Sequence, residues 1–162
     1  MQDLALYTAV FVASATPVLE VWIAVPAGIA AGLPAVPTAL VGIAGNFITV
    51  AIVVYAGDSI RAWWRKRRAA SDGGTGTQPK INPRTERIKQ RFGLPGLALV
   101  APFVIGSHLG AVGAVALGSP RTAVLSWFLA SLVLQATVFG GMAVLGVGYS
   151  AAQADALPLP GF

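Results

Sequence analysis

The sequence has no cysteine and only one histidine in 162 residues. Without cysteine there is no disulfide framework, thiolate metal site or cysteine nucleophile. One histidine and six acidic residues are also too few for a metal cluster, so we expect no metal and no other cofactor. We find no hydrolase, redox or phosphotransfer constellation, and therefore do not predict an enzyme. Only 10% of the residues are charged, against about 25% in soluble domains. With 56% hydrophobic residues and a mean hydropathy of +0.73, the chain is predicted to be an integral membrane protein.

The positive charge is confined to one segment. The formal net charge is +5, and ten of the eleven lysines and arginines lie between Arg61 and Arg91. A basic segment between apolar segments is retained in the cytoplasm, because lysine and arginine resist translocation. We therefore interpret residues 58–92 as a basic cytoplasmic loop that contacts anionic lipid headgroups. Binding to nucleic acid is the weaker alternative for this loop, and we expect no nucleic-acid partner.

Four apolar blocks surround this loop, at residues 4–33, 36–57, 94–118 and 122–148. A spanning helix needs about 20 apolar residues, so blocks 36–57 and 122–148 are predicted to be transmembrane helices. The predicted organisation is a first membrane repeat at 1–57, the loop at 58–92, a second membrane repeat at 93–148 and a tail at 149–162.

The other two blocks are interrupted by proline and glycine. Both residue types weaken a helix, and a broken helix persists in hydrocarbon only where protein or a water-filled cavity satisfies the freed backbone groups. We therefore predict re-entrant helical hairpins at 4–33 and 94–118. The residues expected at the hairpin turns are Pro17, Pro26, Gly28, Pro102, Gly106 and Gly110.

The two halves echo each other, which favours an internal repeat. Pro26-x-Gly28-x-x-x-Gly32 precedes a helix that opens at Pro37, and Pro102-x-x-x-Gly106-x-x-x-Gly110 precedes one that opens at Pro120. The predicted fold class is an all-α integral membrane protein of two inverted repeats, each a re-entrant hairpin followed by a transmembrane helix. Both termini are then extracytoplasmic in a prokaryotic inner membrane. If all four blocks span fully instead, both termini are cytoplasmic.

A few polar residues lie inside the apolar blocks, where ionisable groups are usually functional. Glu20 is the one acid there, and His108 lies in the second hairpin next to Ser107. Each of the two ionisable residues is either a pathway residue that exchanges protons or a structural residue bonded to a broken helix. Asn46 and Gln135 bind either substrate or a neighbouring helix. The predicted proton or substrate pathway is Glu20, His108, Ser107, Asn46 and Gln135. Thr49, Ser126, Ser131 and Thr137 are interpreted as packing residues.

Several motifs resemble the small multidrug export protein family. They are Pro17-Val18-Leu19-Glu20, Pro26-Ala27-Gly28, Gly45-Asn46, Phe92-Gly93-Leu94-Pro95-Gly96-Leu97, and Pro102 to His108. The similarity covers about residues 14–148. Two positions depart from the family pattern. Val21 stands where an arginine is common, and the second turn has Val104 and Ser107-His108 in place of a second proline and a threonine. The resemblance implies a small membrane exporter, which we expect to be proton-coupled and to carry a small amphipathic solute.

The layout is also similar to the DedA superfamily, which implies an alternative function as a translocase of polyprenyl-phosphate or phospholipid carriers. DedA-like sites use arginine within the membrane, whereas the four apolar blocks contain none. A third alternative is a membrane scaffold that transports nothing. Because four blocks are few for a complete path, we expect a homodimer, with membrane lipids and a small-molecule or lipid substrate as the other partners.

Overall fold

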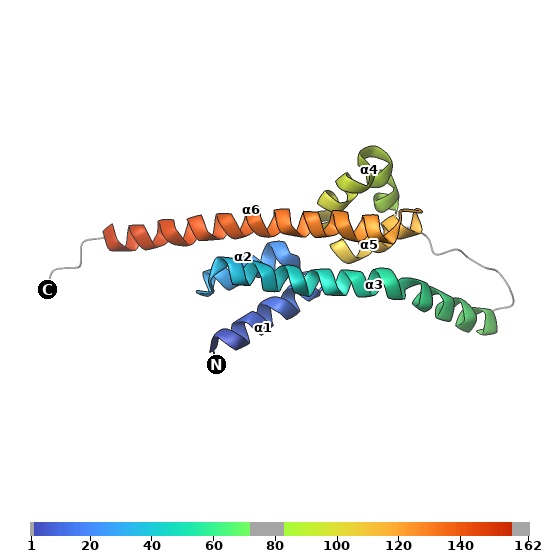
Figure 1. Ribbon diagram of the computed structural model, residues 1–162, viewed down its shortest axis with the longest axis horizontal. Helices are drawn as coiled ribbons and strands as arrows, with labels where there is room; N and C mark the ends of the chain where they lie inside the picture. The colour runs from blue at the N-terminus through green and yellow to red at the C-terminus, as the bar shows by residue number, and fades with distance from the viewer. Residues whose placement is uncertain (1, 72–82, 157–162) are drawn as a thin grey trace. The chain divides into compact units, whose positions relative to one another are not determined.

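The computed structural model describes residues 2–71 and 83–156, and all regular structure in those ranges is α-helical (Figure 1). The all-helical prediction is therefore confirmed for the part of the chain that is described. The helices are α1 (Gln2–Ala15), α2 (Glu20–Ala30), α3 (Ala35–Ser71), α4 (Pro83–Val104), α5 (Ser107–Ala116) and α6 (Arg121–Ala156). Two stretches, Ala35–Ala56 and Arg121–Gly148, are long and apolar enough to cross a membrane. They match the two predicted transmembrane blocks to within two residues.

The first interrupted block is a helical hairpin. α1 packs against α2, and residues 16–19 form the turn that includes Pro17. Pro26 and Gly28 do not lie at this turn, contrary to the prediction, because both are inside α2. Gly28 instead lets α1 approach, since a Cβ atom there would lie 2.7 Å from Val10 Cγ2.

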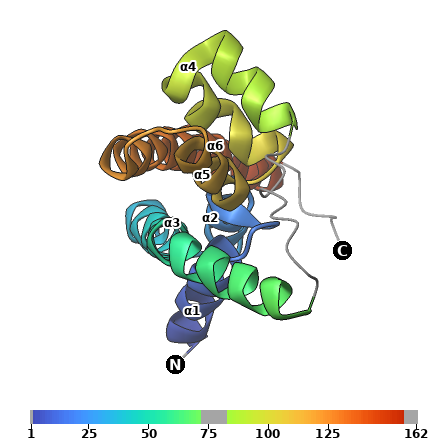
Figure 2. The same ribbon diagram turned by 90° about the vertical axis from the view of Figure 1, so that its right-hand side faces the viewer.

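The second interrupted block is also a helical hairpin, but its first helix is broken. Gly93 has φ 67° and ψ −168°, which divides α4 into two parts (Figure 2). The hairpin turn consists of residues 105 and 106, after which α5 packs against α4. Pro102 and Gly110 were expected at the turn but lie inside α4 and α5, respectively. Gly110 serves helix packing, because a Cβ atom there would lie 2.4 Å from Ala101 Cβ.

Pro102 leaves one backbone carbonyl of α4 without its helical donor, and a side chain of the neighbouring helix α6 supplies another. Proline has no N–H to donate to the carbonyl four residues earlier, which here belongs to Ala98. The Ser131 hydroxyl of α6 donates to that carbonyl oxygen at 2.7 Å, and Ser131 is buried. Replacement of a lost backbone donor by a serine hydroxyl is one way in which proline is tolerated in membrane helices. The predicted packing role of Ser131 is therefore confirmed.

The end of each hairpin and the start of the long helix that follows it repeat the same backbone hydrogen bonds at an offset of 86 residues. Gly32 and Gly118 both have a positive φ (97° and 84°) and bond to the carbonyls of Ile29 and Val115. The long helices then begin at Ala35 and Arg121, again 86 residues apart. Three more pairs of backbone hydrogen bonds recur at this offset. In the first repeat they are Ala31 N to Ala27 O, Leu33 N to Gly28 O and Thr38 N to Pro34 O. Their counterparts in the second repeat are, in the same order, Leu117 N to Gly113 O, Ser119 N to Ala114 O and Val124 N to Pro120 O.

This register differs from the one expected from the proline and glycine spacing. The sequence comparison aligned Pro26 with Pro102, whereas the structure aligns Pro34 with Pro120 at the start of each long helix. Pro26 lies in the second helix of its hairpin and Pro102 lies in the first helix of its own, so the two prolines are not equivalent. An internal repeat is therefore present in the backbone, but not in the residues first compared.

The chain divides into two compact units that do not coincide with the two sequence repeats. Unit 1 contains Met1–Asn46 and Leu132–Phe162, and unit 2 contains Phe47–Ser131. Each unit therefore combines one hairpin, the first part of the long helix that follows it and the second part of the other long helix. The division into membrane repeats at 1–57 and 93–148 follows the chain order and stays a prediction.

Helices also extend further than predicted at both ends of the basic segment and in the tail. α3 continues to Ser71 and α4 begins at Pro83, so the predicted loop 58–92 is largely helical where it is described. The segment is rich in arginine, lysine and alanine, which have high helix propensity. α6 also continues to Ala156, into the predicted tail at 149–162, over residues that are rich in alanine. Residues 72–82 and 157–162 lie outside the described residues.

The core of unit 2 is formed by small and medium apolar side chains. Its buried residues are Val50, Val54, Leu97, Ala98, Ala101, Ala111, Ala114, Val124 and Phe128. A cluster in unit 1 contains Val10, Ala24 and Leu33. Many of these residues are alanine, and small residues allow helix backbones to approach closely where apolar burial does not drive association. Each hairpin is thereby held against parts of both long helices.

Candidate functional site

Glu20 is buried at the tip of the first hairpin. It is the first residue of α2 and is 1% exposed, beside the fully buried Val21. Its backbone N–H bonds to the carbonyl of Thr16 across the turn at 3.4 Å. A carboxylate at the first turn of a helix interacts favourably with the helix dipole, by about 0.3–1 kcal/mol at exposed positions. The predicted acid therefore occupies a defined, enclosed position within unit 1.

The backbone of Glu20 is strained. Its φ is +38°, and it is the one non-glycine residue with a positive φ in ranges 2–71 and 83–156. The equivalent position of the second hairpin, 86 residues later, is Gly106 with φ 86°. Glycine adopts this conformation readily, whereas other residues incur about 1–3 kcal/mol of strain. The first hairpin therefore has a carboxylate residue at a position where the second hairpin has a glycine, which adopts the same conformation without strain. Backbone strain that is kept at one residue is a reason to look for a functional role there.

Besides Glu20 and Thr38, whose hydroxyl donates to the Pro34 carbonyl at 2.6 Å, three more polar residues are buried in unit 1. Ser14 lies near the end of α1, Asn46 follows Gly45 on α3, and Gln135 lies on α6. One side-chain atom of Glu20 and of each of these three residues has no hydrogen bond within the described part of the chain: Ser14 Oγ, Glu20 Oε2, Asn46 Nδ2 and Gln135 Oε1. Glu20, Asn46 and Gln135 each make further interactions. The unit thus has both donor and acceptor capacity in an apolar environment.

Helix packing brings these residues to the same hairpin. Gly45, next to Asn46, approaches α1 so closely that a Cβ atom would lie 2.5 Å from the Phe11 carbonyl oxygen. On α6, Phe139 lies one turn after Gln135 and packs its ring against Trp22, with centroids 6.0 Å apart. Trp22 is two residues after Glu20. Asn46 and Gln135 therefore lie on helix segments that contact the first hairpin.

His108 occupies the tip of the second hairpin and is bonded at both ring nitrogens. The hydroxyl oxygen of Thr49 on α3 lies 2.9 Å from Nε2, and that of Ser107 lies 3.3 Å from Nδ1. Ser107 and His108 are the first two residues of α5 and are 0% and 5% exposed. All three residues belong to unit 2.

The structure divides the predicted pathway residues between the two units. Ser107 and His108 are together in unit 2, whereas Glu20, Asn46 and Gln135 belong to unit 1. Thr49 was interpreted as a packing residue and instead contacts the imidazole. The signal that could have identified Thr49 is the repeat. Thr49 lies 86 residues before Gln135, which was itself predicted to be a pathway residue. Thr137 and Ser126 bond to carbonyls of their own helix, as expected of residues outside the site.

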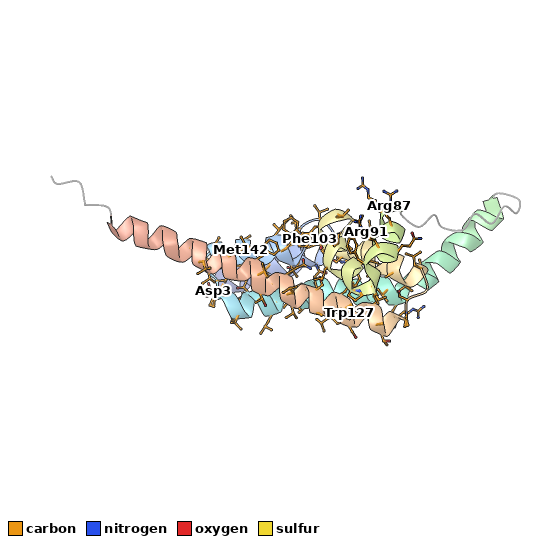
Figure 3. All side chains as sticks on the ribbon, turned by 90° about the horizontal axis from the view of Figure 1, so that it is seen from above. Asp3, Arg87, Arg91, Phe103, Trp127 and Met142 are labelled. Carbon is orange, nitrogen blue, oxygen red and sulfur yellow. The ribbon has the colours of Figure 1, made fainter. Side chains whose placement is uncertain are left out.

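A basic face occupies the first part of α4. Arg84, Arg87 and Arg91 are exposed and spaced so that they lie on one side of the helix. The side chains of Arg87 and Arg91 extend from the ribbon in Figure 3, and the Arg91 guanidinium lies 5.4 Å from the Phe92 ring centroid. Arg121, at the start of α6, lies 5.8 Å from the centroid of the exposed Tyr55 ring. Arginine beside exposed aromatic rings is typical of a membrane interface.

One family model matches the chain. Its description is "Putative small multi-drug export protein", and it covers residues 20–138. The matched region begins at Glu20 and includes Asn46, Ser107, His108 and Gln135. No curated protein and no solved structure matches the chain.

Proposed function

The chain belongs to the small multidrug export protein family, and from this premise we propose that it exports small amphipathic organic solutes across a membrane in exchange for protons. Two helices long and apolar enough to span a bilayer support the membrane location. The inner membrane of a prokaryote is the proposed location. The family description supports export, while the proton coupling and the solute class are our proposal.

The observation that carries this proposal is the buried, strained Glu20. A carboxylate in an apolar setting binds either a proton or a cationic solute, but not both, because each neutralises the same charge. Proton binding from one side therefore releases the solute, and solute binding from the other side releases the proton. Asn46 and Gln135, from helices α3 and α6, offer hydrogen bonds to the polar groups of the solute. Exchange at one acid couples the two fluxes.

The lengths of the hairpin helices support a re-entrant arrangement. α2 has 11 residues and α5 has 10, which correspond to about 15–17 Å at 1.5 Å per residue. The hydrocarbon core is about 30 Å thick, so neither helix crosses it. We propose that both hairpins enter the membrane halfway, from opposite sides, as two inverted repeats. The tips carrying Glu20 and His108 then lie near the bilayer midplane, where transporter sites are usually formed.

The basic face of α4 supports a membrane-surface contact. The exposed Arg84, Arg87 and Arg91 complement anionic lipid headgroups on the cytoplasmic side, and the break at Gly93 separates this part of α4 from the apolar hairpin. We also propose that two chains assemble as a homodimer, because four membrane segments are few for a solute path. Native mass measurement in detergent tests the dimer, and a mass of one chain would contradict it.

Transport measurements with a Glu20→Gln variant test the function. Proteoliposomes containing the full chain are loaded with ethidium, a lipophilic organic cation, and subjected to a pH gradient. The wild type is expected to move ethidium in exchange for protons, whereas E20Q loses the gradient-driven flux by about tenfold or more, since general acid–base groups contribute on this scale. Asp3→Asn is the matched control, because Asp3 is an exposed acid on α1 and its neutralisation leaves the flux unchanged.

Three outcomes contradict the proposal. Gradient-driven ethidium flux that is undiminished in E20Q shows that this carboxylate is not the coupling group. A wild type that moves a fluorescent phospholipid but not ethidium would favour the lipid-carrier translocase of the sequence-based alternatives. Absence of any flux, together with tolerance of Glu20→Ala, would favour a membrane scaffold.

A further inference from the structure

The one histidine of the chain is held between two hydroxyl groups. Thr49 Oγ1 is 2.9 Å from Nε2 and Ser107 Oγ is 3.3 Å from Nδ1. The three residues come from two elements of unit 2, with Thr49 on α3 and the other two in the first turn of α5. His108 is 5% exposed. Two buried apolar residues of the unit 2 core are close in sequence to the contacting residues, Val50 to Thr49 and Ala111 to His108. The imidazole is therefore enclosed, and each of its nitrogens has a hydroxyl group within hydrogen-bond distance.

Hydroxyl groups on both nitrogens make the two imidazole tautomers nearly equivalent. A neutral imidazole donates from one nitrogen and accepts at the other. A carboxylate or a backbone carbonyl would accept only, and would fix the proton on the nitrogen that faces it. A hydroxyl donates or accepts by rotation of its hydrogen. Thr49 and Ser107 therefore satisfy either tautomer without movement of any heavy atom.

We propose that Thr49, His108 and Ser107 form a proton-transfer chain in unit 2, in which the hydroxyl protons and the imidazole protons shift together. The Thr49 hydroxyl gives its proton to Nε2 while Nδ1 gives its proton to Ser107 Oγ. A hydrated proton then replaces the one that Thr49 Oγ1 gave, and Ser107 Oγ passes its surplus proton to a water molecule. Each O–H or N–H bond that breaks is matched by one that forms, and no electrons are gained or lost. The inference rests on the proposed function only in identifying the proton as a transported species.

On the second hairpin the Thr49–His108–Ser107 proton-transfer chain would pass the proton on, whereas on the first hairpin Glu20 would bind it. The two hairpins are equivalent at an offset of 86 residues, but their polar groups differ. Unit 1 has a carboxylate and two amides, which hold a proton or a solute, whereas unit 2 has an imidazole and two hydroxyl groups, which pass a proton on. The repeat has therefore separated binding from relay between its two copies.

The chain contains one histidine, which allows a direct test on the whole protein. Protein labelled with [15N]histidine and reconstituted in lipid nanodiscs gives one pair of imidazole nitrogen signals, with no assignment problem. The wild type at a pH where the ring is neutral is expected to show two nitrogen shifts averaged by tautomer exchange. The isosteric variant Thr49→Val removes the hydroxyl group that lies 2.9 Å from Nε2. The shifts then separate toward the tautomer with the proton on Nδ1, because a buried N–H without an acceptor is the costlier state.

Thr137→Val is the matched control, since the exposed Thr137 hydroxyl donates to the carbonyl of Val133 within its own helix. Its nitrogen signals are expected to equal those of the wild type. Thr49→Ser, which keeps the hydroxyl, restores the averaged shifts. A wild-type ring fixed in one tautomer, or equal effects of T49V and T137V, would overturn the proton-transfer chain.

Transport provides the second readout. In ethidium-loaded proteoliposomes, T49V and His108→Gln are expected to slow gradient-driven flux by about tenfold, while T49S and T137V retain most of it. Flux unchanged in T49V contradicts the relay but leaves the exporter function intact. A wild type that carries no ethidium contradicts the exporter function, while the nitrogen signals still decide whether the relay exists.

Discussion

Single residues set how closely the helices of unit 1 approach each other. Gly45 on α3 faces the backbone of α1, where a Cβ atom would lie 2.5 Å from the Phe11 carbonyl oxygen. Real Cβ atoms do not approach a backbone oxygen so closely, and neither partner is the mobile end of a side chain. The corresponding residue of the second repeat is Ser131, whose side chain meets a backbone carbonyl of α4 by a hydrogen bond. At this position the first repeat therefore has no side chain, which leaves room for the carbonyl of the neighbouring helix. The second repeat has a hydroxyl group that donates to such a carbonyl.

Gly45→Ala is expected to destabilise the protein by about 1–3 kcal/mol through overpacking. Helix propensity alone predicts the opposite sign, because alanine is more favourable than glycine in a helix by about 1 kcal/mol. Gly141→Ala is the control, since a Cβ atom at Gly141 meets nothing within 4 Å, and it should keep or raise stability. Thermal unfolding in one detergent compares the two variants. A melting temperature for G45A at or above that of G141A would show that α1 and α3 are not in close contact there.

Burial of ionisable residues was predictable from sequence, whereas their surroundings were not. Glu20 and His108 were selected because they interrupt apolar blocks, and both are buried. Nothing in the sequence indicated the positive φ of Glu20, since that conformation follows from the geometry of the turn. Thr49 was missed because a threonine in an apolar helix usually bonds within its helix, as Thr137 does. Its contact with His108 joins residues 59 positions apart.

At the scale of elements, proline positions were poor guides to the turns. Of the three prolines expected at the hairpin turns, Pro26 and Pro102 lie inside α2 and α4, and Pro17 is at its turn. A soluble helix seldom tolerates internal proline, but a packed neighbour that supplies a donor removes most of the penalty. The hydroxyl of Ser131 does this for the Ala98 carbonyl. Sequence alone does not reveal such a donor, because it comes from a helix 33 residues away in the chain.

The pairing of Ser131 with Pro102 predicts a non-additive effect in a double-mutant cycle. Ser131→Ala leaves the buried Ala98 carbonyl without its hydroxyl donor and is expected to cost about 1–3 kcal/mol. Pro102→Ala restores a backbone N–H to the same carbonyl, so S131A should cost much less in the P102A background. Unfolding of the four proteins in detergent measures the coupling. Equal costs of S131A in both backgrounds would show that the hydroxyl does not substitute for the N–H that Pro102 lacks.

For the whole molecule, the number of apolar segments and the all-helical class were predictable from composition and periodicity. The two compact units were not, because they combine parts of the chain from opposite ends. A constant offset of 86 residues relates the two halves in backbone geometry, although the prolines and glycines first compared do not follow it. The positive φ is kept at Glu20 and Gly106 although their side chains differ. Repeats of this kind are therefore found in the structure before they are found in the sequence.

The orientation of the whole chain in the membrane is tested by labelling, and the absence of cysteine makes every introduced cysteine unique. The inverted arrangement predicts that Asp3→Cys, near the start of α1, reacts with a membrane-impermeant maleimide added to intact cells. Gln78→Cys, within the basic segment, reacts only after the cells are opened. Both reactions follow from retention of ten lysines and arginines in the cytoplasm and from hairpins that do not cross. If instead both blocks 4–33 and 94–118 span fully, the segment stays inside but Asp3→Cys is also protected. Protection of D3C would therefore contradict the re-entrant hairpins while leaving the cytoplasmic position of the basic segment unchanged.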